Sequence, residues 1–145
     1  MKKSKKNIEY PMNYKTIGFL TDPIRSKQIK NLAKIGGSGA CALYIFLVFK
    51  LANYGGNLAY VNEDDSANLI PYDIYETDHG LYVDHKLIDL LYEDCPEHVD
   101  YENASKYISY MFLPEVNLLG VREDGMCYIK DLVYEDNGVF LNISI

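Results

Sequence analysis

Residues 39–54 limit the fold of this chain more than any other segment. Thirteen of these sixteen residues are apolar, and only Lys50 is charged. As an α-helix the segment would be about 24 Å long. Its sixteen residues are fewer than the ~20 apolar residues needed to span a bilayer. A helix that is apolar on nearly every face must be covered on several sides. We therefore expect a buried central helix in a small domain, and no membrane association.

The cysteine content indicates where such a protein would reside. Cys41, Cys95 and Cys127 are an odd number of cysteines, and the lysine-rich start of the chain has no apolar segment behind it. A secretory signal needs that apolar segment. Reduced thiols are the simplest account of these residues. We expect a cytoplasmic protein.

The charges are distributed unevenly along the chain. Residues 1–34 contain nine Lys or Arg and two acids, for a sum of +7, and residues 35–145 contain five Lys or Arg and nineteen acids, for a sum of −14. These sums give the net charge of −7. We predict a flexible basic tail over residues 1–8 and one acidic domain over residues 9–145. The tail would either hold a polyanion or be solvated.

The first predicted helix covers residues 23–35. Asp22 is a typical N-cap, Pro23 suits the first helical position, and Gly36 suits the end. The pattern places Ile29, Leu32 and Ala33 on the inner face, and it places three lysines opposite them. These are Lys27, Lys30 and Lys34. They form either a solvated face or a contact surface for phosphate.

The remaining pattern predicts alternating short strands and helices. Strand-like segments cover residues 57–61, 69–75 and 80–83, a polar loop covers 62–68, and a short strand or extended arm lies within 10–20. Asp84 would cap a helix over 85–93, and Asp100 would cap one over 101–113. Hairpins follow over 118–129, turning at Asp124 and Gly125, and over 132–145, turning at 136–138.

This order of elements defines a fold class. Two helices followed by a β-hairpin, packed on an earlier helix, are typical of a winged helix-turn-helix. We therefore predict an α+β fold: a winged helix around the long apolar helix, with the hairpin as its wing.

Catalytic and metal-binding patterns are weak. Cys95 and His98 form one ligand pair, whereas structural zinc takes four ligands. The glycine-rich segment 36–39 lacks the Gly-Lys-Ser/Thr ending of a phosphate loop, and a turn between helices explains it better. The fourteen tyrosines either lie half-buried or form a stacking surface. We expect a protein that is not an enzyme, without a metal or other cofactor.

Three blocks of sequence resemble the N-terminal domain of phage replisome-organiser proteins, which initiate replication. The blocks are FLTDPIRSKQIKNLAKI, GSGACALYIFLVFKLANYGGNLAY and NLLGVREDGMCYIKDL. They match the family's entry into its first helix, its long apolar helix with the following turn and strand, and its wing. The resemblance covers roughly residues 14–133.

The resemblance implies a winged helix that binds double-stranded DNA at an origin-like site and helps to recruit a replicative helicase or its loader. It makes residues 101–113 the recognition helix. The side chains facing the major groove would be those of Asn103, Lys106, Tyr107 and Tyr110. Arg122 and Lys130 of the wing would contact phosphate. The fold is compatible with a homodimer, although no heptad pattern argues for one.

The net charge of residues 35–145 supports an interpretation other than DNA binding. DNA affinity comes mainly from neutralised phosphates, and residues 35–145 sum to −14. Either the three lysines of the first helix form a separate basic face, or the domain is an acidic protein-interaction module. Such a module would bind a host or phage protein through a tyrosine-rich surface, or act as a mimic of DNA.

Overall fold

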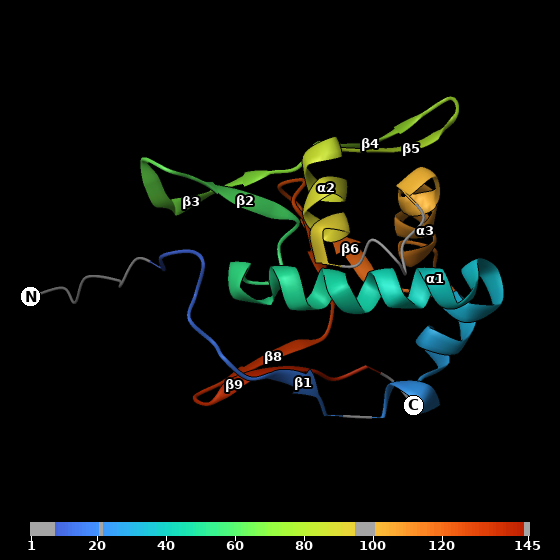
Figure 1. Cartoon of the computed structure of the whole chain (residues 1–145), viewed down its shortest axis with the longest axis horizontal. Coiled ribbons are helices and arrows are strands. Elements are labelled where there is room, and N and C mark those ends of the chain that lie inside the picture. The colour runs from blue at the N-terminus through green and yellow to red at the C-terminus, as the bar shows by residue number, and fades with distance from the viewer. Residues whose placement is uncertain (1–7, 21, 95–100, 144–145) are drawn as a thin grey trace, which may run out of the picture.

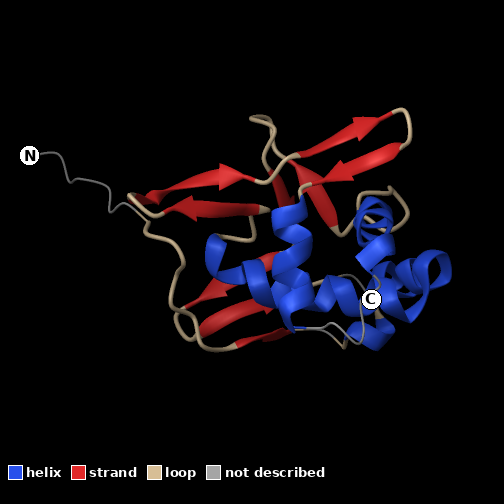
Figure 2. Cartoon of the chain, turned by 45° about the horizontal axis from the view of Figure 1, so that its top comes forward, coloured by secondary structure: helices blue, strands red, loops and turns tan. Residues whose placement is uncertain are grey.

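A computed structural model describes residues 8–20, 22–94 and 101–143, and the fold is organised around one long helix (Figure 1). Helix α1, Lys27–Leu51, crosses the middle of the molecule. Helices α2, His85–Asp94, and α3, Ala104–Met111, pack on one side of α1, and a small sheet lies on the other side (Figure 1). Figure 2 shows strands on both sides of the helices. The predicted α+β class is confirmed.

Helix α1 begins later than predicted. Pro23–Arg25 forms a 3₁₀ turn, η1, in which the Asp22 carboxylate accepts a hydrogen bond from the Ile24 amide over 3.0 Å. The α-helix starts at Lys27, after Ser26, whose hydroxyl oxygen accepts a hydrogen bond from the Ile29 amide over 3.3 Å. Ser26 is therefore the N-cap of α1, and Asp22 caps only the turn before it.

Two predicted helices are joined into one element by a kink. Gly37 has φ 77° and ψ −171°, a backbone conformation that is favourable only for glycine. The helical residues before and after it therefore run in different directions. The predicted turn between helices is confirmed as this kink. At its other end α1 passes into a second 3₁₀ turn, η2, Ala52–Tyr54, and Gly55 ends it in the left-handed conformation.

The second half of α1 forms the centre of the core, as predicted. Six of its residues are at most 1% exposed: Ala40, Leu43, Tyr44, Leu47, Val48 and Leu51. By length and composition alone, Lys27–Tyr54 would also suffice to cross a membrane. The buried side chains of this helix pack against residues of α2, α3 and the strands.

The first half of α1 confirms one predicted face and corrects the other. Lys27, Lys30 and Lys34 are exposed, as expected, but Ala33 is exposed as well. Gln28 takes the inner position that we expected of Ala33 and is only 8% exposed. The helix begins four residues after Pro23, and its inner face follows the contacts made by Gln28 and Leu32.

Two hairpins connect η2 to α2. The first pairs β2, Ala59–Asn62, with β3, Asp65–Pro71, and the second pairs β4, Ile74–Thr77, with β5, Gly80–Val83. The predicted loop 62–68 is therefore wrong for its second half, because pairing with β2 draws polar residues into β3. The predicted strand 69–75 is interrupted after Pro71, where the buried Tyr72 separates the two hairpins.

The two predicted helices after this region are present. The Asp84 carboxylate accepts a hydrogen bond from the Lys86 amide over 3.0 Å and caps α2, as predicted. The second helix is shorter than predicted, because Tyr101–Asn103 forms a 3₁₀ turn, η3, and the α-helix ends at Met111. Asp100, its predicted cap, lies outside the described residues, as do the tail residues 1–7 and the Cys95 and His98 pair.

The predicted wing is a hairpin of β6, Leu119–Val121, and β7, Cys127–Ile129. Residues 56–58 add a third partner to it. The Leu58 amide donates to the Cys127 oxygen over 2.9 Å, and the Ile129 amide donates to the Gly56 oxygen over 2.7 Å. The spatial order is therefore residues 56–58, then β7, then β6.

The last hairpin pairs with a strand from the N-terminal part of the described chain. Strands β8, Leu132–Glu135, and β9, Gly138–Leu141, pair antiparallel, which confirms the predicted turn. Strand β1, Ile17–Phe19, lies parallel to β9, with Gly18 opposite Phe140. The pattern of residues 10–20 predicted an extended segment and did not indicate its partner.

Candidate nucleic-acid interface

Helix α3 carries three of the residues predicted to contact DNA, with the fourth, Asn103, at its N-cap, and two of the three face α1 instead. A Cβ atom built on Gly39 would lie 3.2 Å from the Tyr107 hydroxyl oxygen, and one built on Gly36 would lie 3.1 Å from the Tyr110 ring. The two tyrosines are half-buried against these glycines. The predicted orientation of Tyr107 and Tyr110 toward an open face is wrong, because the glycines allow the rings to approach the α1 backbone.

The opposite flank of α3 is covered by the β4–β5 hairpin. Ser109 and Phe112 face that side. This leaves a narrow outward ridge, on which Lys106 and Glu102 are exposed and Asn103 is partly exposed. Lys106 is therefore the one predicted α3 cation that a duplex can reach, and Glu102 on the same ridge opposes its charge.

The two predicted wing cations make contacts within the fold. The Arg122 guanidinium lies over the Tyr128 ring, 4.2 Å from the ring centroid, and donates a hydrogen bond to the Asn57 side-chain oxygen. Lys130 donates to the Asn117 side-chain oxygen over 2.7 Å. The tip of the hairpin carries the exposed acids Glu123 and Asp124. Arg122 thus stabilises the junction of residues 56–58 with the hairpin.

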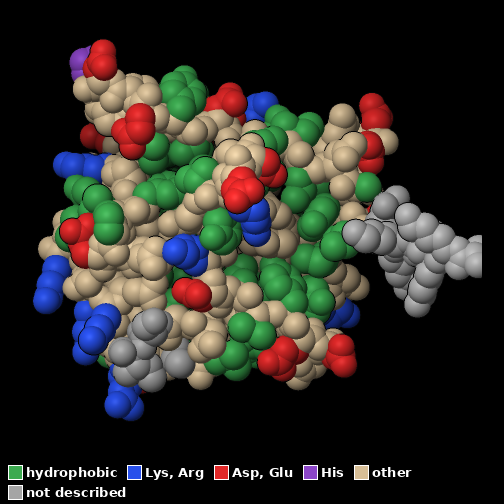
Figure 3. Space-filling view, turned by 180° about the vertical axis from the view of Figure 1, so that it is seen from behind, with side chains coloured by type: hydrophobic (Ala, Val, Ile, Leu, Met, Phe, Trp, Pro, Cys, Tyr) green, Lys and Arg blue, Asp and Glu red, His purple; other side chains and the backbone are tan. Residues whose placement is uncertain are grey.

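The basic residues of η1 and α1 form the most cationic part of the described surface. Arg25, Lys27, Lys30 and Lys34 are exposed, and residues 23–62 contain no Asp or Glu. Lys and Arg side chains gather along the left edge of Figure 3, on the side where the first half of α1 lies. We call these four residues the basic edge. Lys106 is exposed on α3, which contacts α1 through Tyr107 and Gly39.

A polar cluster on α2 and η3 has a structural explanation. The Tyr101 hydroxyl donates to the Asp89 carboxylate over 2.9 Å, and this hydrogen bond raises the pKa of Tyr101. The His85 Nδ1 atom lies 3.5 Å from the same hydroxyl oxygen. All three side chains are exposed, so the cluster links η3 to α2 at the surface.

Metal binding has no support in residues 8–20, 22–94 and 101–143. Within these ranges no three His, Cys, Asp or Glu side chains come close enough together to hold an ion. Cys41 and Cys127 are free thiols, and burial raises the pKa of both. This lowers the fraction of each that is thiolate, the form that binds metals.

Comparison of the chain with protein-family models, curated proteins and solved structures found no match. The resemblance to replisome organisers therefore stays a prediction.

Proposed function

We propose that this chain is a winged-helix domain that binds double-stranded DNA. The observation that carries the proposal is the pairing of residues 56–58 with β7. A winged helix consists of a helix, a short strand, a helix-turn-helix and a hairpin whose second strand pairs with the first strand. The order α1, residues 56–58, α2, α3, β6 and β7 is of this kind, with the β2–β3 and β4–β5 hairpins inserted before α2.

The basic edge is the surface that supports DNA binding best. Lys27, Lys30 and Lys34 are separated by about one turn each and extend over about 10 Å of helix. A duplex presents about six phosphate charges over that length. Residues 23–62 lack acids, and the exposed acids that border the basic edge are Asp22, which caps η1, and Glu115, whose backbone oxygen accepts from Asn31. Lys106 then supplies a contact from α3.

The biological role follows from the sequence resemblance. On this proposal, the domain binds an origin-like site in the cytoplasm and acts in the replication initiation of a phage-type element. Protein partners of that process, such as a helicase loader, would bind elsewhere on its surface.

Fluorescence anisotropy of a labelled duplex tests the proposal. We expect affinity to fall log-linearly with salt, and Lys30→Ala with Lys34→Ala to reduce the slope by about 1.8, since each phosphate contact contributes about 0.9. The matched control is Lys15→Ala with Lys86→Ala, two exposed lysines elsewhere, which should leave the slope unchanged.

Deletion of residues 1–7 separates the domain from its lysine-rich start. DNA binding that survives the deletion supports the basic edge. Binding that disappears with the deletion, or that is absent even at low salt, would contradict the proposal.

A further inference from the structure

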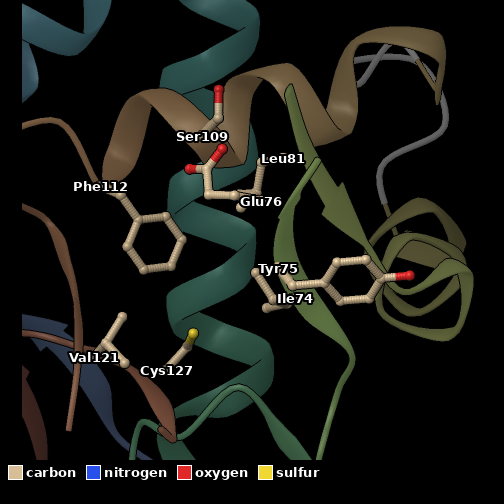
Figure 4. Close-up of a pocket in the computed structure, with 8 residues that line it drawn as sticks. All are labelled: Ile74, Tyr75, Glu76, Leu81, Ser109, Phe112, Val121 and Cys127. Atoms are coloured by element: carbon tan, nitrogen blue, oxygen red, sulfur yellow. The ribbon is translucent and has the colours of Figure 1, made fainter. Parts of the chain in front are cut away.

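A groove lies between three elements that are distant in the sequence (Figure 4). Its volume is about 380 Å³. Ile74 and Leu81 line it from the β4–β5 hairpin, Phe112 from the end of α3, and Val121 and Cys127 from the β6–β7 hairpin (Figure 4). The volume is at the lower end of the range for ligand sites, and it leaves room for a large apolar side chain.

The lining of the groove is apolar and partly open to solvent. Val121 is 59% exposed on β6, and Cys127 at 9% forms part of the floor. Ile74, Leu81 and Phe112 are half-buried. Contiguous exposed apolar surface of this kind marks interaction sites more often than isolated apolar residues do, because covering it removes apolar area from water.

One acid, Glu76, lines the groove, and the two hairpins that form its sides are acidic in sequence. Residues 73–84 and 119–129, which form its two hairpins, contain one Lys or Arg and six acids: Asp73, Glu76, Asp78, Asp84, Glu123 and Asp124. The single cation, Arg122, is held over Tyr128. Glu76 lies at one end of the groove beside Ser109 (Figure 4), and it has no ion-pair partner in the described part of the chain. This charge favours a cationic occupant over an anionic one such as a nucleic acid.

The strands beside the groove also offer their backbone. Strand β6 is at the end of its sheet, and β4 pairs only with β5 among the described strands. The outer edges of such strands present N–H and C=O groups to which an extended peptide can add.

We infer that this groove binds an extended, basic segment of a partner protein, with one large apolar side chain inserted between Phe112 and Val121. Lysine or arginine residues on either side of that anchor would lie near Glu76, Glu123 and Asp124. The groove is distinct from the basic edge, and the inference does not rest on DNA binding.

A set of three peptides provides the test. The probe is fluorescein-labelled Lys-Lys-Leu-Phe-Lys-Lys, and its controls are Lys-Lys-Ser-Ser-Lys-Lys and Glu-Glu-Leu-Phe-Glu-Glu. We expect saturable binding of the probe by anisotropy, at least about tenfold weaker binding of the serine peptide, and no binding of the acidic peptide. In ¹⁵N spectra, the amides of Glu76, Ser109 and Val121 should shift with the probe.

Matched variants locate the binding site. Val121→Asp changes an exposed side chain and should weaken probe binding about tenfold or more, with the fold checked by circular dichroism. Glu76→Lys should also weaken it. Glu63→Lys, the same charge change at the exposed tip of the β2–β3 hairpin, should not.

Several results would overturn the inference. They are equal binding of the probe and the serine peptide, unchanged binding to Val121→Asp, and no saturation up to about 1 mM peptide. Sedimentation velocity could also show a concentration-dependent dimer that is lost in Val121→Asp. That result would assign the groove to a second copy of this chain instead. Lys30→Ala with Lys34→Ala should bind the probe normally, so failure of the DNA proposal is separable from failure of this one.

Discussion

The side-chain amide of Gln28 donates a hydrogen bond over 2.8 Å to the backbone oxygen of Asn117. Gln28 is on the first half of α1, and Asn117 follows α3, where its side-chain oxygen accepts from Lys130. The helix that carries the basic edge is thus tied to the segment between α3 and the hairpin. A second tie is the hydrogen bond from the Asn31 side chain to the Glu115 oxygen over 2.7 Å.

Loss of the Gln28 hydrogen bond should destabilise the protein. We expect Gln28→Ala to lower the free energy of unfolding in urea by about 1 kcal/mol, because the Asn117 backbone oxygen loses its donor. Lys30→Ala, at an exposed position of the same helix, is the control and should stay within about 0.5 kcal/mol. Equal effects of the two substitutions would show that the Asn117 contact contributes little.

Gly36 is expected to tolerate no side chain. In Gly36→Ala the new Cβ would lie 2.6 Å from the Ala40 Cβ and 3.1 Å from the Tyr110 ring. Overpacking of this kind costs about 1–3 kcal/mol, and urea unfolding measures it. Gly18→Ala is the control, since its Cβ would meet Phe140 at an ordinary 3.7 Å. A neutral Gly36→Ala would mean that α3 can move away from α1.

Substitution of Arg122 distinguishes a structural role of this residue from the phosphate contact that the resemblance implies. Because its guanidinium lies over Tyr128, we expect Arg122→Ala to lower the free energy of unfolding by about 1 kcal/mol. The salt slope of DNA binding should not change. Glu123→Ala, the adjacent exposed residue, should leave stability within about 0.5 kcal/mol. A reduced slope with unchanged stability would support the wing contact instead.

Stability should fall at alkaline pH through Tyr72. Burial, more than the nearby Tyr54 and Asp84, raises the pKa of Tyr72 to about 12, against about 10 for an unfolded chain. The unfolded state loses this proton first, so the contribution of Tyr72 is complete below about pH 10 and is lost as pH rises through about 12.

Urea unfolding between about pH 9 and 12 measures this loss. We expect Tyr72→Phe to flatten the decline by an amount on the order of 1–2 kcal/mol. Tyr75→Phe, at a ring that is 55% exposed, serves as the control. An identical decline in Tyr72→Phe and the wild-type chain would contradict the prediction.

Signals within a few residues predicted local structure well. The Asp84 cap, the turn at Asp124 and Gly125, and the apolar run of the central helix all appear in the structure. The start of the first helix was predicted wrongly, because Asp22 and Ser26 are both acceptable caps and only the packing of Gln28 and Leu32 distinguishes them.

The candidate sites were predicted less completely. The lysines of the basic edge followed from helical periodicity. The orientations of Tyr107, Tyr110 and Arg122 did not, because each depends on a residue of another element: Gly39, Gly36 and Tyr128. The groove has no sequence signature, since its lining residues come from three separate segments.

The sequence by itself therefore determined the central helix, the caps and turns, and the separation of basic and acidic segments, because these depend on composition and on neighbours within one or two turns of chain. The tertiary structure decided the pairing of Gly18 with Phe140 and of residues 56–58 with β7. It also decided which side of α3 remains open. Contacts between distant segments form wherever burial of the whole core is most favourable, and no local pattern encodes that choice.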